Sequence, residues 1–391
     1  MSRLPRQVKL FGAVSLLNDF ASEMVYPLLP ALVTTTLGAG AAALGALDGA
    51  ADFASSVVKY RAGRLADRHA RRGPLIVAGY AVAVLVRPVI ALAGAAWQVI
   101  GLRVADRLGK GVRTPPRDAL IADATPLALR GRAFGLQRGL DHIGAVLGPL
   151  AAWLLLVNGW GVRGVIAASV VPGVMVLGLA VWAVRGGRGR SKAVDVIDAP
   201  PSPALARPRP SIPPSLAAIA SFHFLRLPEA LAILWVQQRG IAVAHVPLLW
   251  AGVHVVKAGT SFWGGALADR VGPDRTLALG WTSYALVAAG CALARTSWQA
   301  AGLFLVLGVV AGLTESPERT LVARGAGARQ GTGFGAYHAM TGLAALAGGL
   351  ALGVVVQRWG ASAAFAASAL TALTLVVLRP LVVPRAPAAP A

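Results

Sequence analysis

The stretch that most constrains the fold is Gly101–Asp118, a strongly charged segment set in apolar sequence. Its charged residues are Arg103, Asp106, Arg107, Lys110, Arg113, Arg117 and Asp118. A charge near the centre of a bilayer costs about 2.5–3.5 kcal/mol on insertion scales, so a lipid-facing helix does not carry this many. The charged positions recur at helical i, i+3 and i+4 intervals and therefore share a face. The stretch predicts a membrane-spanning helix whose charged face is turned toward protein or water.

The rest of the chain has the composition of a polytopic membrane protein. Of its 391 residues, 56% are hydrophobic, and the mean hydropathy is +0.65. Apolar runs of roughly 20 residues, the length that one helix needs to cross a bilayer, recur from end to end. We predict an all-α polytopic membrane protein with twelve transmembrane helices, at about 8–33, 44–60, 74–94, 97–122, 131–156, 163–184, 215–238, 246–268, 275–294, 298–322, 332–356 and 360–382.

Positive charge is distributed unequally between the two sides of such a bundle. The loops on the side of the N-terminus hold 23 of the 37 Lys and Arg residues. The opposite loops hold only Arg163, Arg239, Arg295 and Arg358. Because Lys and Arg mark cytoplasmic loops, we expect a multi-pass protein of the bacterial inner (cytoplasmic) membrane with both termini in the cytoplasm. The net charge of +21 is then a topology signal and does not indicate a nucleic-acid partner.

A stretch rich in proline, arginine and glycine divides the chain near its middle. Residues 185–214 begin Arg-Gly-Gly-Arg-Gly-Arg-Ser-Lys and continue with several prolines, a composition from which no core can form. We predict an N-terminal six-helix bundle at 1–184, a disordered cytoplasmic linker at 185–214, a C-terminal six-helix bundle at 215–384 and a tail at 385–391.

The two halves repeat each other. Gly63-Arg-Leu-Ala-Asp67-Arg68 recurs 202 residues later as Gly265-Ala-Leu-Ala-Asp269-Arg270. Gly131-Arg-Ala-Phe134-Gly135 recurs 200 residues later as Gly331-Thr-Gly-Phe334-Gly335. Two parallel six-helix repeats are typical of transporters whose substrate site lies between the halves, near the middle of the membrane.

In these repeated segments the chain resembles the major facilitator superfamily. Gly63-Arg-Leu-Ala-Asp67-Arg68-His-Ala-Arg71-Arg72 is similar to the family signature Gly-x-x-x-Asp-Arg-x-Gly-Arg-Arg, with Ala70 in place of a glycine. The resemblance implies that these loops latch the outward-facing state through charge pairs at helix ends; anchoring of the topology is the alternative role. The candidate gating residues are Gly63, Asp67, Arg68, Arg71, Arg72, Arg117, Asp118, Gly265, Asp269 and Arg270.

The fifth predicted helix carries a second resemblance. Gly144-Ala-Val-Leu-Gly148-Pro149 is similar to a Gly-x-x-x-Gly-Pro element of the family's antiporters, without the glycine pair that usually follows it. Glycine allows close helix packing, and proline frees a backbone carbonyl. Gly144, Gly148 and Pro149 are therefore candidates for helix packing, either as part of an antiporter element or as a plain packing motif.

The resemblance also implies that the first, fourth, seventh and tenth helices line a central cavity, and the unexpected charges collect there. A proton-coupled carrier needs a carboxylate whose neutral form is favoured by burial and whose ionised form is favoured by a nearby cation. The candidates for proton coupling are Asp19, Glu23 and Asp141, with Arg107, Lys110 or Arg113 as switching partners. The candidates for substrate binding are Arg107, Lys110, Arg113, Arg226, Glu229, Glu315 and Glu318. Fixed salt bridges between helices are the alternative role for each.

We therefore expect a secondary active transporter that exports a small organic solute by alternating access, driven by protons, with sodium left open as the coupling ion. Proton-coupled uptake of an organic anion or other nutrient is the alternative, because the cations of the fourth helix suit a carboxylate or phosphate. No enzyme activity is expected, and the sequence has no P-loop. With one cysteine, Cys291, and few His and Met residues, no cofactor or metal is expected. The expected partners are the solute, protons and the lipid bilayer, and the protein is expected to be a monomer.

Overall fold

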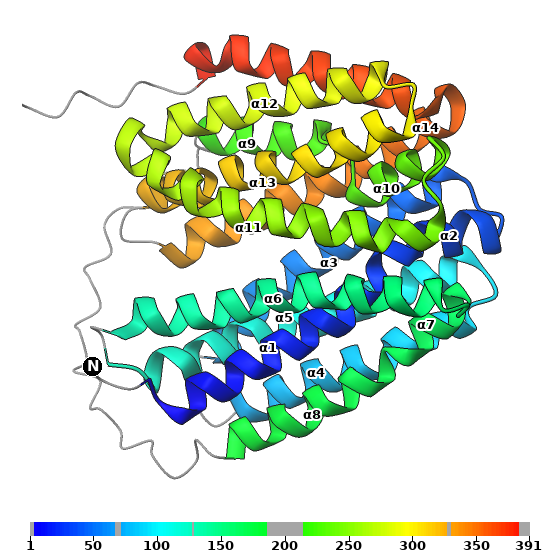
Figure 1. Cartoon of the computed structure of the whole chain (residues 1–391). Coiled ribbons are helices and arrows are strands. Elements are labelled where there is room, and N and C mark those ends of the chain that lie inside the picture. Colours follow the sequence, from blue (N-terminus) through cyan, green and yellow to red (C-terminus); the bar gives the residue numbers. More distant parts are fainter. Residues whose placement is uncertain (1–3, 67–71, 127–128, 186–213, 327–329, 383–391) are drawn as a thin grey trace, which may run out of the picture.

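The computed structural model describes residues 4–66, 72–126, 129–185, 214–326 and 330–382, and the regular elements in these ranges are helices (Figure 1). They form the twelve predicted spans. The first six spans are α1 (Arg6–Val25) with a continuation to Thr36, α3 (Ala41–Ala66), α4 (Arg72–Val89) with a turn to Leu92, α5 (Ala96–Asp123), α6 (Arg130–Val157), and α7 (Val162–Ala168) with α8 (Val170–Arg185). The last six are α9 (Pro214–Leu225) with α10 (Glu229–Gln238), α11 (Val246–Val271), α12 (Pro273–Leu293), α13 (Ser297–Ala326), and the two arms of α14 (Gln330–Val382).

Hydropathy and charge distinguish the more apolar spans from α1, α5 and α11. Eight segments of the described helices are long and apolar enough to cross a membrane. One of them, Gly333–Leu378, has 46 residues and covers both spans of α14. α5 is not among these segments because its charged residues make it too polar, which agrees with the expectation that its charged face avoids lipid.

Proline and glycine residues set the breaks in several spans. α1 continues through a 3-10 turn at Tyr26–Leu28 and a π turn at Leu32–Thr36, beside two prolines. Pro228 has an extended backbone (φ −54°, ψ 144°) and separates α9 from α10. Gly360, with φ of 84°, ends the eleventh span and begins the twelfth. A proline removes a backbone donor, and glycine adopts a positive φ at no steric cost, so these residues interrupt helices where the chain must bend.

The spans form two bundles, α1–α8 and α9–α14 (Figure 1). We call the side on which the chain's N-terminus lies the terminal side, and the opposite side, with the loop at 37–40 and the turn at Gly360, the far side. The bundles meet mainly through α3 against α14 and α6 against α11. In Figure 1 they converge at the far side and diverge toward the terminal side. The predicted linker, except for Arg185 and Pro214, and the predicted tail lie outside the described residues.

Glycines permit the closest contacts within each bundle. A Cβ atom at Gly144 or Gly148 would lie 2.1 or 2.2 Å from a carbonyl oxygen of α1, so α6 and α1 touch through their backbones. Gly348 is the counterpart of Gly148 in the repeat, and a Cβ there would lie 2.0 Å from the carbonyl oxygen of Phe224 in α9. The internal repeat thus preserves the same close contact in both bundles. Pro149 follows directly within α6.

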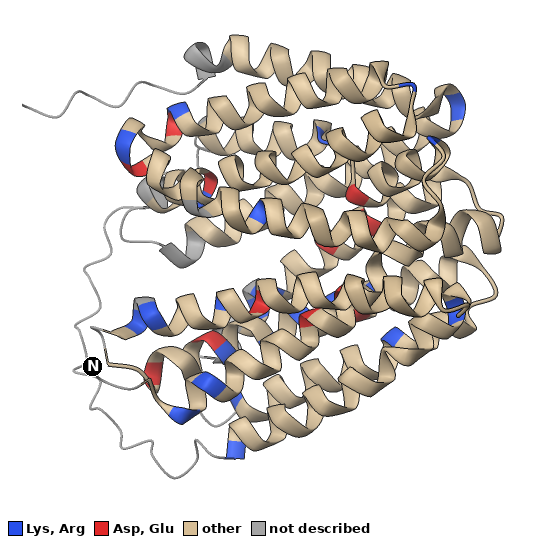
Figure 2. Cartoon of the chain, viewed as in Figure 1, with Lys and Arg blue, Asp and Glu red and all other residues tan. Residues whose placement is uncertain are grey.

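Charged residues are excluded from most of the outer surface. Figure 2 shows Lys, Arg, Asp and Glu near the terminal side, at a few turns of the far side and among the helices that face the other bundle, whereas the middle of the outer helices is largely uncharged. The inner helices therefore hold the candidate site.

Candidate functional site between the two bundles

The charged face of α5 is divided between a buried core and the space between the bundles. The side chains of Arg103, Asp106 and Arg113 are 4%, 1% and 2% exposed. Arg107 and Lys110 are half-buried. The first group is enclosed because α5 packs closely against α3 and α4. Only the second group remains available to a solute.

Asp106 is the centre of the buried group. Its carboxylate accepts a hydrogen bond from Arg87 Nε at 2.9 Å and pairs with Arg103 Nη1 at 3.4 Å. The Arg87 guanidinium, which comes from α4, also donates to the backbone and side-chain oxygens of Asn18, both at 3.1 Å. This network joins α1, α4 and α5 inside the first bundle.

Arg113 belongs to the same buried network. It donates to the Asn18 side-chain oxygen and to the Gly79 carbonyl oxygen, both at 3.1 Å, and its guanidinium lies 4.6 Å from the centre of the Tyr80 ring. The sequence predicts Arg113 as a substrate-binding residue and a switching partner. In the structure it contacts α1 and α4 in the core and does not join Arg107 and Lys110.

Glu23, a predicted proton-coupling residue, connects the two bundles. Its carboxylate accepts a hydrogen bond from Trp250 Nε1 at 2.9 Å and lies 3.6 Å from His254 Nε2. Both partners are on α11 of the second bundle. The expected cationic partner on α5 is therefore replaced by an aromatic donor and a histidine from the opposite bundle.

The other two predicted coupling residues have partners within the first bundle. Asp19 accepts a hydrogen bond from the neighbouring Asn18 Nδ2 at 2.9 Å. Asp141 pairs with Arg138 one helical turn away on α6, at 3.4 Å. Neither forms an ion pair with a cation of α5, so the predicted switching pairs are not formed in this structure.

Asp48 joins the bundles at a second point, which the sequence analysis did not assign. Its Oδ2 accepts hydrogen bonds from the Tyr26 hydroxyl at 2.8 Å and from the Ala230 backbone N–H at 2.9 Å. Ala230 lies in the first turn of α10, whose N-cap residue Pro228 has no capping side chain, and helix N-termini favour an anion. The Arg103 guanidinium lies 4.7 Å from the Tyr26 ring centre, which connects this junction to the buried network.

Asp48→Ala is expected to loosen the far-side junction, because the Ala230 N–H and the Tyr26 hydroxyl both lose their buried acceptor. A buried unsatisfied polar group costs about 1–3 kcal/mol, so amide exchange at the start of α10 should accelerate by roughly tenfold or more. Hydrogen exchange read by mass spectrometry on the purified protein measures this. Asp48→Asn, which keeps an acceptor oxygen, should behave like the wild type; equal exchange in Asp48→Ala and wild type would contradict the prediction.

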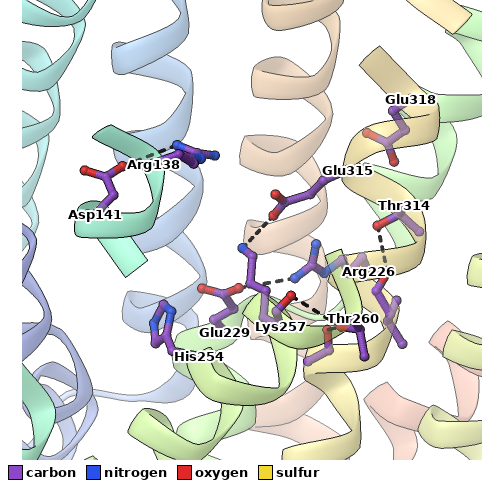
Figure 3. A network of polar contacts seen from close by, with 12 residues as sticks. Arg138, Asp141, Arg226, Glu229, His254, Lys257, Thr260, Thr314, Glu315 and Glu318 are labelled. Atoms are coloured by element: carbon purple, nitrogen blue, oxygen red, sulfur yellow. Dashed lines mark hydrogen bonds and ion pairs between the residues drawn. The ribbon is translucent and has the colours of Figure 1, made fainter. Parts of the chain in front are cut away.

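The second bundle contributes two ion pairs to the space between the bundles. Arg226 pairs with Glu229 at 3.2 Å across the break between α9 and α10. Lys257 of α11 pairs with Glu315 of α13 at 2.5 Å. Figure 3 shows these pairs facing Arg138 of α6 in the first bundle. Arg226, Glu229 and Glu315, three of the four predicted substrate-binding residues of the second bundle, thus meet in one region, with their charges compensated.

Glu318 lies in a more enclosed position than these pairs. Its side chain is 3% exposed, accepts a hydrogen bond from the Tyr337 hydroxyl at 2.9 Å and lies 3.1 Å from His223 Nε2. It connects α13 with α9 and α14 within the second bundle. Its geometry is that of an interhelical contact.

A pocket adjoins the ion pairs in the second bundle. The space between its lining atoms, counted together with the open solvent at its mouth, is about 530 Å³. Its charged lining consists of Arg226, Glu229 and Lys257. The aromatic residues in its wall are Trp250, Tyr284, Phe304 and Phe365.

The predicted gating residues are only partly described by the structure. Arg72 forms an ion pair with Asp123, which joins the start of α4 to the end of α5. Arg117 pairs with its neighbour Asp118 at 2.9 Å and donates to the Ser15 hydroxyl of α1 at 3.2 Å. These contacts hold the helix ends of the first bundle together on the terminal side.

The predicted gating residues of the two repeated loop motifs form fewer contacts in the described residues. Gly63 lies in the last turns of α3, and Asp67, Arg68 and Arg71 lie outside the described residues. Gly265, Asp269 and Arg270 lie in the last turns of α11. Asp269 and Arg270 are exposed and form no hydrogen bond or ion pair with any side chain in the described ranges. The resemblance assigns the charge pairs of these loops to the outward-facing state, so the gating role of this second copy stays a prediction.

Comparisons with known proteins agree with the fold. The family model described as Major Facilitator Superfamily matches residues 11–348 and 230–391. An uncharacterized protein of Mycobacterium tuberculosis (strain ATCC 25618 / H37Rv) is 30% identical over 355 residues, 89% of this chain and 86% of that protein. An uncharacterized MFS-type transporter of Methanocaldococcus jannaschii is 27% identical over 357 residues, 90% of this chain and 88% of that protein.

Two further matches support weaker conclusions, one because it covers a third of the chain and the other because the sequence identity is low. The multidrug resistance protein MdtH of Photorhabdus laumondii is 34% identical over 133 residues, which is 34% of this chain and 33% of that protein. The crystal structure of the nucleoside transporter NupG superposes with a TM-score of 0.72 at 11% identity, covering 95% of this chain and 98% of that one. At this identity the structural likeness shows the fold alone.

Proposed function

This chain belongs to the major facilitator superfamily, and on that premise we propose that it exports a small organic solute from the cytoplasm in exchange for protons. It is a multi-pass membrane transporter and not an enzyme. In such a carrier the two bundles rock around a central site that opens to one side of the membrane at a time. The observation that carries the proposal is the bond between Glu23 and α11 across the two bundles.

The distribution of basic loops supports placing the terminal side in the cytoplasm of a bacterial cell. With that orientation, the described state has its bundles joined on the outer side and faces inward. The hydrogen bonds and ion pairs that join the bundles within the described residues involve Glu23, Asp48 and the pair Ala42–Gln357, all in the far-side half. Because one chain supplies both walls of the site, we propose that the monomer is the working unit.

Proton coupling follows from the environment of Glu23. The Trp250 hydrogen bond and the nearby His254 hold the Glu23 carboxylate against α11, and this contact keeps the carrier inward-facing. A solute that binds against Trp250 competes with the bond and allows the bundles to part on the far side. There the carboxylate takes up a proton as the solute leaves. The neutral carrier returns, and the proton is released inward when Glu23 re-forms its bonds.

Glu23→Gln is expected to abolish solute movement driven by a pH gradient, because the amide cannot carry a proton through the cycle. The amide oxygen still accepts the Trp250 hydrogen bond, so the fold and solute-for-solute exchange should survive. Purified protein in liposomes with a trapped pH-sensitive dye, screened against a library of small organic solutes, measures proton movement upon solute addition. Labelled solute then measures exchange.

Asp274→Asn is the matched control, because Asp274 is an acid in the first turn of α12 without a hydrogen-bond or ion-pair partner in the described part of the chain. It should keep proton-coupled transport. Unchanged coupling in Glu23→Gln would reject Glu23 as the proton carrier. Coupling to an imposed sodium gradient in place of the pH gradient would reject protons as the driving ion.

Export is favoured by the partial match to MdtH, a protein described as a multidrug resistance protein, although it covers only a third of this chain. The second candidate is proton-coupled uptake of an organic anion, which is favoured by the half-buried cations Arg107 and Lys110. Under an imposed pH gradient, export moves solute against the proton flow and uptake moves it with the proton flow. The liposome experiment therefore separates the two.

A further inference from the structure

Four cations of the inner helices have no bonded polar partner in the described part of the chain. No hydrogen bond or ion pair is formed there by Lys59 of α3, Arg107 and Lys110 of α5, or Arg319 of α13. The Nε atom of Arg107 is fully buried without an acceptor. A guanidinium in a membrane protein is expected to have its donors satisfied, so this group lacks an acceptor.

These cations lie close enough to repel one another. Lys59 is within electrostatic range of Arg107 and Arg319, and Lys110 is within range of Arg107 and Lys59. They approach from α3 and α5 in the first bundle and from α13 in the second. Like charges that converge in a space of low dielectric favour an anion between them.

Most acids of the region are already engaged. Asp141 pairs with Arg138, Glu315 with Lys257, and Glu23 with α11. Within the described residues, two acids form no ion pair: Asp52, near Lys59 and Arg107, and Asp19, near Lys110. Two such carboxylates beside four unpaired cations leave the region with surplus positive charge.

The aromatic pocket borders this region. Glu23 connects the two, because it is bonded to Trp250 in the pocket wall and lies within electrostatic range of Arg107. Lys257 also lines the pocket, on the side that faces the first bundle (Figure 3). Aromatic walls favour the flat apolar face of a ring, which gains from stacked and edge-to-face contacts.

We propose, on the basis of the transport function proposed above, that the solute is an organic anion with an apolar ring. Its carboxylate or phosphate is bound by Arg107 and Lys110, where the Arg107 guanidinium can donate to two oxygens at once. Its ring lies in the pocket against Trp250. In this position the ring competes with the hydrogen bond between Glu23 and Trp250. Substrate binding thereby loosens the contact between the bundles on the far side.

Binding to the purified full-length protein, without a pH gradient, tests this inference. The probes are one- and two-ring compounds in matched carboxylate, phosphate, carboxamide and amine forms, measured by calorimetry and by the shift in melting temperature that a bound ligand produces. Carboxylates and phosphates are expected to bind at least tenfold more tightly than the amides and amines of the same ring. Equal or tighter binding of the amines, or no binding of any anion in the panel, would overturn the proposal.

Variants locate the anion. Arg107→Gln and Lys110→Gln should each weaken binding of the preferred anion by about tenfold or more, because each removes a charged hydrogen bond. Arg107→Lys keeps the charge and should lose less, which separates binding from folding. Arg295→Gln, in an exposed far-side loop, is the matched control and should bind as wild type. Full affinity in Arg107→Gln and Lys110→Gln would overturn the assignment.

The two proposals fail separately. If anions bind but no proton moves with them, proton-coupled export is rejected and the anion site stands. If cationic or neutral solutes are exported against protons, export stands and the anion site is rejected.

Discussion

Asp106→Ala is expected to destabilise the first bundle by about 3–5 kcal/mol, the cost typical of breaking a buried ion pair by removing one partner. Arg87 and Arg103 would then lose their common carboxylate while enclosed between α1, α4 and α5. Both guanidinium groups are nearly inaccessible to solvent, at 4% exposure each, so water cannot take the place of Asp106. The loss of stability comes from the positive charges of Arg87 and Arg103, which stay buried without a counter-charge.

Unfolding of the detergent-solubilised protein, followed by circular dichroism and by tryptophan fluorescence, measures the effect. Asp52→Ala is the control, because it removes an aspartate from a neighbouring helix where the side chain is exposed. Its melting temperature should stay close to that of wild type. A double variant, Arg87→Met with Asp106→Leu, should recover part of the stability, because it removes opposite charges together. A melting temperature unchanged in Asp106→Ala would show that the network contributes little.

The sequence was sufficient to predict the fold and the membrane helices. Their length, hydropathy and repeated motifs are local properties, and a charged stretch such as α5 must turn its polar face away from lipid. The sequence was not sufficient to predict which charged residues of that face are buried inside the first bundle and which remain accessible between the bundles. Arg107 and Arg113 are both arginines on the same helix, yet only Arg113 lies against Tyr80 of α4. Which cation enters the core depends on the rotation of α5 against α4, which helical periodicity does not fix.

The partners of the carboxylates were harder still to predict. Glu23 was identified as a candidate because an acid in an apolar helix is costly, but its partners Trp250 and His254 are more than 220 residues away. Asp48 was overlooked because its role depends on the helix break at Pro228, which exposes the first N–H groups of α10. Such pairings join residues of the two bundles, so they depend on how the bundles are placed against each other, which no local pattern in the sequence indicates.

Glycines at the bundle interface explain how the far side closes. A Cβ at Gly45 of α3 would lie 1.9 Å from the carbonyl oxygen of Gly349 in α14, and a Cβ at Gly349 would lie 2.5 Å from the carbonyl oxygen of Gly45. Real Cβ atoms essentially never lie within 3.0 Å of such atoms, and both neighbours are backbone. One turn further, a Cβ at Gly49 would lie 2.7 Å from the Leu346 Cα. The closed far side therefore requires bare backbone on α3 and α14.

Gly45→Leu is accordingly expected to prevent far-side closure and to reduce transport by more than tenfold. The side chain cannot fit between two backbones, and the packed helices cannot deform enough to admit it, so the bundles must stay apart on the far side. Each bundle keeps its own internal contacts, so the protein should still fold. Spin labels are attached at the exposed far-side positions Thr36 and Arg358. The distance between them, measured by double electron–electron resonance, should be longer in Gly45→Leu than in the labelled protein that keeps Gly45.

Gly178→Leu is the matched control for this substitution. Gly178 is exposed on α8, and a Cβ there would meet no atom within 4 Å, so the same change in size should leave both the label distance and transport unaltered. If Gly45→Leu keeps the short distance and full transport, α3 and α14 do not form the far-side seal. If it lengthens the distance while transport continues, closure on that side is not a step of the cycle, and the alternating-access mechanism proposed here fails.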